Sequence, residues 1–282
     1  MGAGVQVLDD LGLRVELAAP PARVVSLVPS WTETLFALGV GPRVAGVTRF
    51  CVAPASEVAP LAKVGGTKNP DLGAIMRLSP DLVIANAEEN RREDIDRLRE
   101  HGIPVFVTYP RTVPGVVESV LRLGSVLGAE HAAAALTREI VMAVSEIEAG
   151  LGVWMKLRLR VFCPVWKNPW MTFNADTYAH DVLRMLGFRN IFAAAGERYP
   201  RVTLQQALEE RPDVVLLPDE PYVFTDDDLR EMKEALPAAL GRRVLLINGR
   251  DLHWYGAHMV RGLRALNQLL ARVRASSGLG SS

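Results

Sequence analysis

The sequence predicts an α/β protein of two Rossmann-like lobes with parallel sheets, joined by one long backbone helix. Short apolar, β-branched runs alternate with helical segments along the whole chain, as in parallel α/β units. A helix, Pro-Asp, strand pattern occurs twice. Between its two copies, residues 130–151 contain neither Gly nor Pro before Gly150, which predicts a helix on the order of 30 Å long.

Residues 24–27 form the first expected strand, and the turn after them leads into a helix. Ser30 with Glu33 three residues later has the pattern of a capping box, and Gly39 is expected to end the helix. Further strands are expected over 44–48, 82–85, 105–108, 159–162, 214–217 and 244–247. Further helices are expected over 72–78, 90–101, 114–127, 178–186 and 204–210, and from Asp226 and His258 onward.

The repeated pattern starts at Leu72 and again at Leu204, 132 residues later, and Pro80 and Pro212 keep the same spacing. A helix followed by Pro-Asp and a strand is also a generic connection, but its recurrence on either side of a long helix favours two related lobes. We therefore expect an N-terminal lobe over 1–128, a connecting helix over 129–152, a C-terminal lobe over 153–275 and a flexible tail over 276–282.

Composition argues against several classes of protein. Lys+Arg and Asp+Glu both number 32, so a net charge of +0 gives no electrostatic footprint for nucleic acid. No apolar run is long enough to span a bilayer. Cys51 and Cys163, in different halves of the chain, are expected to stay reduced. The first residues lack a signal peptide, which predicts a cytoplasmic protein, or a periplasmic or other extracytoplasmic one if a leader has been removed. We expect a monomer.

Aromatic and charged residues follow most of the predicted strands. Ligands of open parallel sheets bind beyond the carboxyl ends of the strands, so these residues are expected to line a ligand cleft between the lobes. Four of the five tryptophans are among them, and each ring could instead simply cover a sheet end. The expected wall consists of Trp31, Phe50, Trp166, Trp170, Tyr199, Tyr222, Trp254 and Tyr255, and the expected polar anchors are Arg49, Glu88, Arg111, Glu220 and His253. Arg49 could alternatively pair with Glu88 or Glu89.

The motifs of common enzyme classes are absent. The chain has no Walker loop, no G-x-S-x-G elbow and no glycine fingerprint after a strand, so we expect a binding protein with no catalytic residues and no directly bound metal. One alternative remains, a metal-handling protein or enzyme that uses Glu220, Asp251, His253 and His258.

Several segments together resemble the helical-backbone periplasmic-binding proteins, the receptors for cobalamin, iron–siderophores and haem that feed ABC importers. The resemblance covers about 5–270 and rests on the order and spacing of its motifs. It implies that helix 130–151 is a rigid spine and that a metal-containing ligand (cobalamin, haem or a ferric siderophore), not a covalent cofactor, is gripped in the cleft. The motifs are Val24-Val25-Ser26-Leu27-Val28-Pro29-Ser30-Trp31-Thr32-Glu33, Asp9-Asp10-Leu11-Gly12, Gly46-Val47-Thr48, Val64-Gly65-Gly66, Pro80-Asp81-Leu82-Val83-Ile84 and Pro212-Asp213-Val214-Val215.

The resemblance also assigns roles to single positions. Phe50, Tyr199 and Trp170 match aromatic positions of cobalamin-binding members, whereas Thr67 and Asn86 stand where tryptophans are expected. Importer-linked members carry one exposed glutamate on each lobe that pairs with arginines of the permease. Gly73 and Gln205 stand at those positions, so an importer permease is a possible partner that has lost two charge-assisted contacts.

Overall fold

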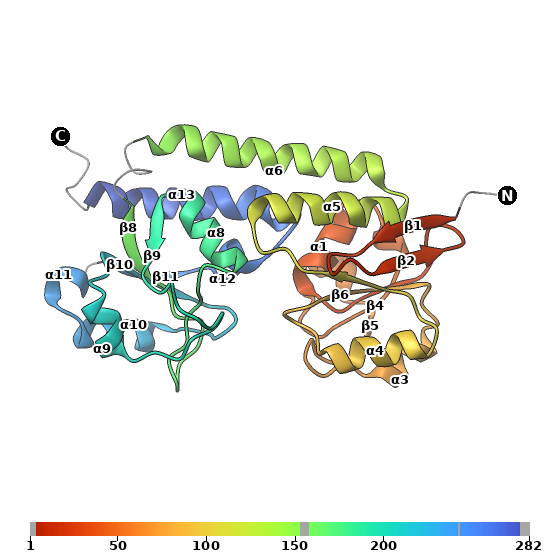
Figure 1. Ribbon diagram of the computed structural model, residues 1–282, viewed down its shortest axis with the longest axis horizontal. Helices are drawn as coiled ribbons and strands as arrows, with labels where there is room; N and C mark the ends of the chain where they lie inside the picture. The colour runs from red at the N-terminus through yellow and green to blue at the C-terminus, as the bar shows by residue number, and fades with distance from the viewer. Residues whose placement is uncertain (1–3, 153–157, 242, 277–282) are drawn as a thin grey trace. The chain divides into compact units, whose positions relative to one another are not determined.

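The computed structural model describes residues 4–152, 158–241 and 243–276 (Figure 1). The chain forms two compact units. Unit 1 comprises the chain as far as Pro110, Pro114–Ile140 and Tyr255–His258, and unit 2 comprises Arg111–Val113, Val141–Trp254 and the chain from Met259 onward. The predicted tail from residue 277 onward, and Trp154, lie outside the described residues.

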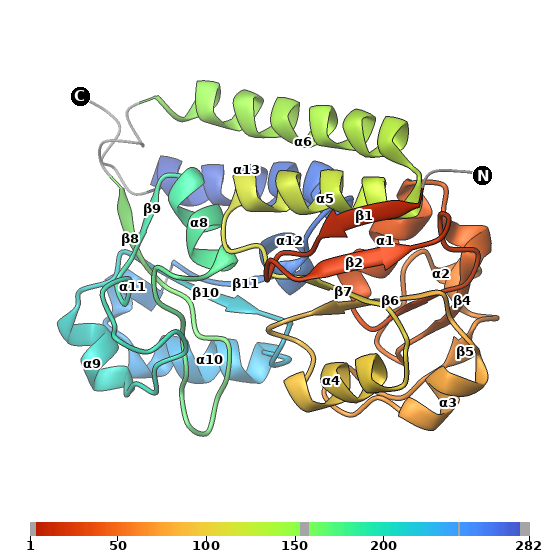
Figure 2. The same cartoon turned by 45° about the vertical axis from the view of Figure 1, so that its right-hand side comes forward.

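A five-stranded parallel sheet organises unit 1. Its strands are β3 (Val24–Ser26), β4 (Val44–Val47), β5 (Ala62–Lys63), β6 (Leu82–Asn86) and β7 (Val105–Thr108), in the order β5-β4-β3-β6-β7. Every residue of β3, β6 and β7 is buried, as expected for apolar strands covered by helices on both faces. Helices α3 and α4 lie on one face of the sheet, and α1 and α5 lie on the other (Figures 1 and 2).

The predicted helices of unit 1 begin and end close to the expected positions. They are α1 (Pro29–Ala37), α3 (Leu72–Arg77), α4 (Arg92–Glu100), α5 (Val113–Leu127) and the first part of α6 (Glu130–Leu151). The 3₁₀ turn η1 (Gly41–Arg43) and the short helix α2 (Ala55–Val58) were not predicted. The predicted capping box at the start of α1 is wrong. The N-cap is Val28 without a side-chain hydrogen bond, since Pro29 already has the φ that a first helical residue needs.

An antiparallel hairpin at the N-terminus of unit 1 was not predicted. It pairs β1 (Val5–Leu8) with β2 (Arg14–Leu17). The Asp10 carboxylate attaches the hairpin to the rest of the unit, because it accepts hydrogen bonds from the Tyr109 amide at 2.8 Å and from Arg122 Nη1 at 2.7 Å.

A four-stranded parallel sheet organises unit 2. Its strands are β8 (Leu159–Phe162), β9 (Phe188–Asn190), β10 (Val214–Pro218) and β11 (Val244–Ile247), in the order β11-β10-β8-β9. Helices α9 and α10 lie on one face, and α8 and α13 lie on the other (Figures 1 and 2). The helices are the last part of α6, α8 (Tyr178–Met185), α9 (Leu204–Glu209), α10 (Asp226–Ala235), α11 (Ala238–Gly241), α12 (Gly249–His253) and α13 (His258–Ser276).

The predicted repeat corresponds to one connection built twice. The Asp81 amide donates to the Arg23 carbonyl at 2.8 Å in unit 1, and the Asp213 amide donates to the Arg160 carbonyl at 2.7 Å in unit 2. Each aspartate carboxylate accepts a hydrogen bond from the amide of that same arginine, at 2.8 Å in both units. The Pro-Asp dipeptide therefore fixes the start of a strand beside its neighbour in both sheets.

Helix α6 is continuous over 22 residues, as the absence of Gly and Pro before Gly150 predicted. Its residues up to Ile140 belong to unit 1 and those from Val141 belong to unit 2. Across the described ranges, none of the helices combines the length and the apolar character needed to cross a membrane.

Candidate ligand-binding residues

Three predicted residues have large exposed aromatic rings. Phe50 is 49% exposed, Trp166 is 44% exposed and Tyr199 is 40% exposed. In the part of the chain that the structure describes, no other aromatic side chain is among the exposed large hydrophobic residues. All three follow the ends of strands or lie in long loops, where a binding surface is expected.

Trp166 belongs to a cluster of aromatic rings in unit 2. Its ring meets the edge of Tyr222, with centroids 5.5 Å apart. Tyr222 lies 4.7 Å from Phe224, and Phe224 stacks on Trp170 at 5.9 Å with an interplanar angle of 7°. Trp170 and Tyr222 pack against the apolar core of the unit, so the cluster has a rigid base and one exposed ring. Sequence reasoning missed Phe224, which is buried behind the predicted wall.

Glu220 holds Trp254 and Arg250 together in unit 2. Its Oε1 accepts from Arg250 Nε at 3.0 Å, and its Oε2 accepts from the indole N–H of Trp254 at 2.9 Å. Helix α12, which was not predicted, carries Arg250, and a Cβ on Gly249 would lie 2.5 Å from the Glu220 nitrogen. Trp254 is only 7% exposed. The predicted anchor Glu220 and the predicted wall residue Trp254 are thus hydrogen-bonded to each other.

Asp176 neutralises the predicted anchor Arg111. The Asp176 carboxylate accepts from Arg111 Nη1 at 2.8 Å and lies 3.6 Å from Arg198 Nε. The Arg198 guanidinium lies 6.0 Å from the centre of the exposed Tyr199 ring. Arg198 thus connects the exposed Tyr199 ring to the ion pair of Arg111 and Asp176.

The segment Tyr255–His258 packs against α1 in unit 1. Tyr255 stacks on Trp31 at 5.9 Å and 24°, and the Ala257 amide donates to Thr34 Oγ1 at 3.1 Å. Gly256 has a φ of 67°, and a Cβ there would lie 2.1 Å from Thr34 Oγ1, so only glycine fits.

This packing corrects the prediction for Trp31. Trp31 is 0% exposed, so in this structure its ring packs beneath Tyr255 and offers no surface to a ligand. The Tyr255 hydroxyl donates to Glu88 Oε2 at 3.2 Å and links Trp31 to the predicted anchor Glu88. Glu33, predicted as part of a capping box, instead lies 3.2 Å from Nδ1 of His258.

Two buried asparagines join the loops around Glu88. Asn86 Oδ1 accepts from the Glu88 amide at 2.8 Å, and its Nδ2 donates to Thr108 Oγ1 at 3.1 Å. Asn90 Nδ2 donates to the Thr67 carbonyl at 2.9 Å. The two positions where the family resemblance expected tryptophans, Thr67 and Asn86, are thus part of a polar network that fixes backbone geometry.

Arg49 and Phe50 form an exposed pair after β4. The Arg49 guanidinium lies 4.9 Å from the centre of the Phe50 ring. The predicted alternative, an ion pair of Arg49 with Glu88 or Glu89, does not form. Within residues 4–152, 158–241 and 243–276, Arg49 has no carboxylate within 4.0 Å.

The four residues of the metal-handling alternative are divided between the two units. His258 belongs to unit 1, whereas Glu220, Asp251 and His253 belong to unit 2. His253 is edge-on to Phe173 at 6.4 Å, and burial lowers its pKa to about 4. Among the described side chains, no group of three or more His, Cys, Asp and Glu is placed to hold a metal ion.

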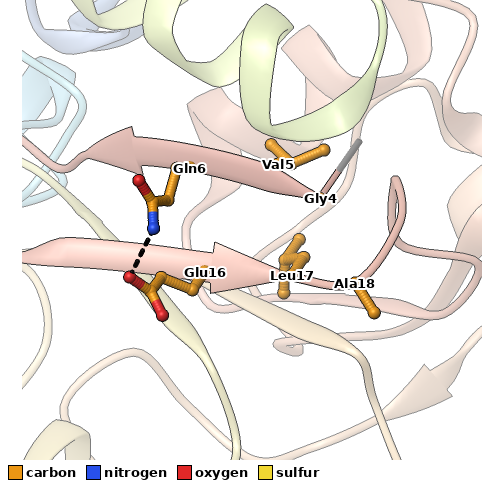
Figure 3. Close-up of a pocket in the computed structure, with 6 residues that line it drawn as sticks. All are labelled: Gly4, Val5, Gln6, Glu16, Leu17 and Ala18. Carbon is orange, nitrogen blue, oxygen red and sulfur yellow. Dashed lines mark hydrogen bonds between the residues drawn. The ribbon is translucent and has the colours of Figure 1, made fainter. Parts of the chain in front are cut away.

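A surface pocket lies on the N-terminal hairpin, and its lining contains none of the predicted site residues (Figure 3). A hydrogen bond of 2.7 Å from Gln6 Nε2 to Glu16 Oε1 crosses it. Its lining consists of short, largely exposed hairpin residues with no aromatic ring, and we assign it no function. These residues are Gly4, Val5, Gln6, Glu16, Leu17 and Ala18.

The two predicted docking positions occupy equivalent places in the units. Gly73 is the second residue of α3 and Gln205 is the second residue of α9. Gln205 is exposed and its Nε2 donates to Glu209 Oε1 at 3.0 Å. A Cβ on Gly73 would lie 3.3 Å from both Arg77 Nη1 and Asp71 Oδ1, which are flexible side chains. Both positions therefore have room for a longer side chain.

Known proteins resemble this chain over most of its length. The profile of a family described as periplasmic binding protein matches residues 24–247. The vitamin B12-binding protein of Vibrio parahaemolyticus is 25% identical over 248 residues, covering 88% of this chain and 87% of that protein.

Two solved structures share the fold. The periplasmic haem-binding protein RhuT from Roseiflexus sp. RS-1, in apo form, superposes with a TM-score of 0.76 at 19% identity, covering 89% of this chain and 98% of that one. The periplasmic vitamin B12 binding protein BtuF of Vibrio cholerae also gives a TM-score of 0.76, at 21% identity, covering 90% of this chain and 98% of that one.

Proposed function

Because this chain belongs to the periplasmic binding protein family, we propose that it binds a bulky metal chelate with a conjugated macrocycle, of the corrinoid or haem class. The family is one of solute-binding proteins, and the prediction of a binding protein without catalytic activity is confirmed by this membership. The ligand class is supported by the names of the relatives and by the chemistry of the exposed side chains.

The observation that carries the proposal is the exposure of Phe50, Trp166 and Tyr199. Large aromatic rings normally bury their surface in a core or an interface, and single rings held in place by packed neighbours are suited to stack on a flat ligand. Trp166 rests on Tyr222, and Phe50 lies beside Arg49, so both rings are held before a ligand arrives. Macrocycles offer wide apolar faces that such rings can cover.

Titration of hydroxocobalamin, cobinamide and haemin onto the purified protein tests the proposal. The expected result is saturable binding of at least one of them at one equivalent. Trp166→Ala and Phe50→Ala should each weaken binding about 5- to 150-fold, corresponding to the 1–3 kcal/mol that stacking on one aromatic ring contributes to base binding.

Val141→Ala is the matched control, because Val141 is 51% exposed but lies on helix α6. Its affinity should equal that of the unmodified protein. Failure of all three macrocycles to bind, together with saturable binding of a bare metal ion or a linear ferric siderophore, would reject the ligand class while leaving the family unaffected.

A further inference from the structure

Four of the predicted aromatic residues have a cation of the protein over one ring face. In each pair the two residues are close in sequence, so the loop that presents the ring also presents the charge. The pairs are Arg49 over Phe50 at 4.9 Å, Lys167 over Trp170 at 5.6 Å, Arg198 over Tyr199 at 6.0 Å and Arg250 over Trp254 at 5.0 Å.

Carboxylates neutralise three of these four cations. Lys167 Nζ lies 2.7 Å from Asp228 and 2.6 Å from Glu231. Arg198 pairs with Asp176, and Arg250 pairs with Glu220, at 3.6 Å and 3.0 Å. Arg49 differs from the other three, because no carboxylate of the described chain lies within 4.0 Å of it.

The position of Arg49 is fixed by the loop between β5 and α3. The Arg49 amide donates to the Gly65 carbonyl at 2.9 Å, which joins the two loops through the backbone. A Cβ built on Gly66 would lie 3.3 Å from the Phe50 ring and 3.4 Å from Arg49 Nη2, so ring and guanidinium both lie against this glycine. The pair therefore presents an aromatic face and a positive charge side by side, on a loop whose backbone is joined to Gly65.

We propose that Arg49 and Phe50 form an anion-recognition subsite in unit 1, which receives a carboxylate or phosphate group carried by the ring-containing ligand. This inference rests on the proposed function and narrows it to ligands with an acidic group at the edge of the ring. A guanidinium can donate two parallel hydrogen bonds to a carboxylate or phosphate. A stacked ligand also excludes water, which strengthens the attraction over that of an ordinary exposed pair.

The test compares haemin with its dimethyl ester, which has the same ring but no free carboxylates. The unmodified protein should bind the acid about fivefold more tightly than the ester, and this preference should shrink at high ionic strength. Arg49→Gln should bring the ratio of the two affinities close to one. Arg92→Gln is the matched control, since Arg92 is an exposed arginine on α4 that pairs with Asp96, and it should keep the full preference.

A second probe pair, naphthalene carboxylate and naphthalene carboxamide, separates this inference from the proposed function. If none of hydroxocobalamin, cobinamide and haemin binds, the proposed function fails. The naphthalene pair then tests Arg49 alone, and a carboxylate preference that Arg49→Gln removes supports the subsite. The inference is overturned if the unmodified protein shows no preference for the acid in either pair, or if Arg49→Gln keeps that preference.

Discussion

Oε2 of Glu220 accepts a hydrogen bond from the indole N–H of Trp254 at 2.9 Å, across 34 residues of sequence. The same carboxylate binds Arg250, whose guanidinium covers the Trp254 ring. Glu220 therefore neutralises a charge and satisfies a nearly buried donor at once, and its role in this structure is to position Trp254.

Glu220→Ala should destabilise the protein by about 1–3 kcal/mol, because it leaves the indole N–H of Trp254 without its acceptor. Urea unfolding measures the loss. Glu231→Ala is the comparison, since Glu231 is exposed and Lys167 keeps Asp228 as a partner after the change. That variant should lose less than about 1 kcal/mol. Equal losses in the two variants would mean that Glu220 makes only an ordinary surface ion pair.

Asp81→Ala and Asp213→Ala should each reduce stability by about 1–2 kcal/mol, since each removes a charged acceptor from the backbone amide that starts a strand. Asp81→Asn and Asp213→Asn keep a side-chain oxygen and should lose less. The measurement is again the free energy of unfolding. If the asparagine variants lose as much as the alanine variants, the hydrogen bond is not the source of the stability.

Burial lowers the pKa of His253 from 6.5 to about 4, so its imidazole stays neutral in the folded protein while the unfolded chain takes up a proton. Its contribution to stability is complete above pH 6.5 and is lost as the pH falls from 6.5 to 4, by about 3 kcal/mol at most. In His253→Gln, which has no imidazole at this position, the free energy of unfolding should decrease less as the pH falls from 6.5 to 4. His131→Gln, at an exposed position on α6, should leave the fall unchanged. An equally steep fall in His253→Gln would contradict the assignment.

Tryptophan fluorescence should fall when a macrocyclic ligand binds, and most of the change should come from Trp166. Trp31 and Trp254 are 0% and 7% exposed, so neither ring is open to direct stacking. Trp166→Phe should therefore remove most of the quenching while it preserves much of the affinity. Trp170→Phe is the comparison, because Trp170 already stacks on Phe224. Quenching that survives in Trp166→Phe would place the ligand elsewhere.

The double change Gly73→Glu and Gln205→Glu should strengthen binding to the permease of a related importer, in a manner that weakens with added salt. Both positions are the second residues of short helices, where a carboxylate is favourable and can reach an arginine of a partner. Surface-immobilised permease measures the affinities at two ionic strengths. Tight binding by the unmodified protein that salt does not weaken would show that these positions do not correspond to docking glutamates.

Local patterns were enough to predict most strands of the two parallel sheets, because apolar runs such as Val24–Ser26 are fully buried and carry their own signal. The short strands β5 and β9 were not predicted. The repeat was also visible, since both copies of the Pro-Asp connection lie within short segments. The capping box failed because Glu33 has a partner, His258, that is 225 residues away in the sequence.

The candidate site could be predicted only in part, because several of its contacts join residues that are far apart in the sequence. Phe50, Trp166 and Tyr199 lie in loops that the sequence pattern identifies, and their rings are exposed, as expected for residues of a binding surface. Nothing near Trp31 in the sequence indicates that Tyr255 covers it. Ion pairs such as Arg111 with Asp176 join residues 65 positions apart. No local rule therefore distinguishes this neutralised arginine from Arg49, which has no carboxylate partner among the described residues.

The contacts of Tyr255–His258 with α1 also decide how this protein can be divided. A gene fragment that stops after α6 would encode every strand of the unit 1 sheet, yet it would lack the ring that covers Trp31 and the amide that binds Thr34. The N-terminal half is therefore not an autonomous module, and a ribosome must finish almost the whole chain before that half can complete its own interior. A circular permutation that joins 255–258 to the N-terminal half would keep these contacts with α1, whereas a simple cut between the halves would remove them.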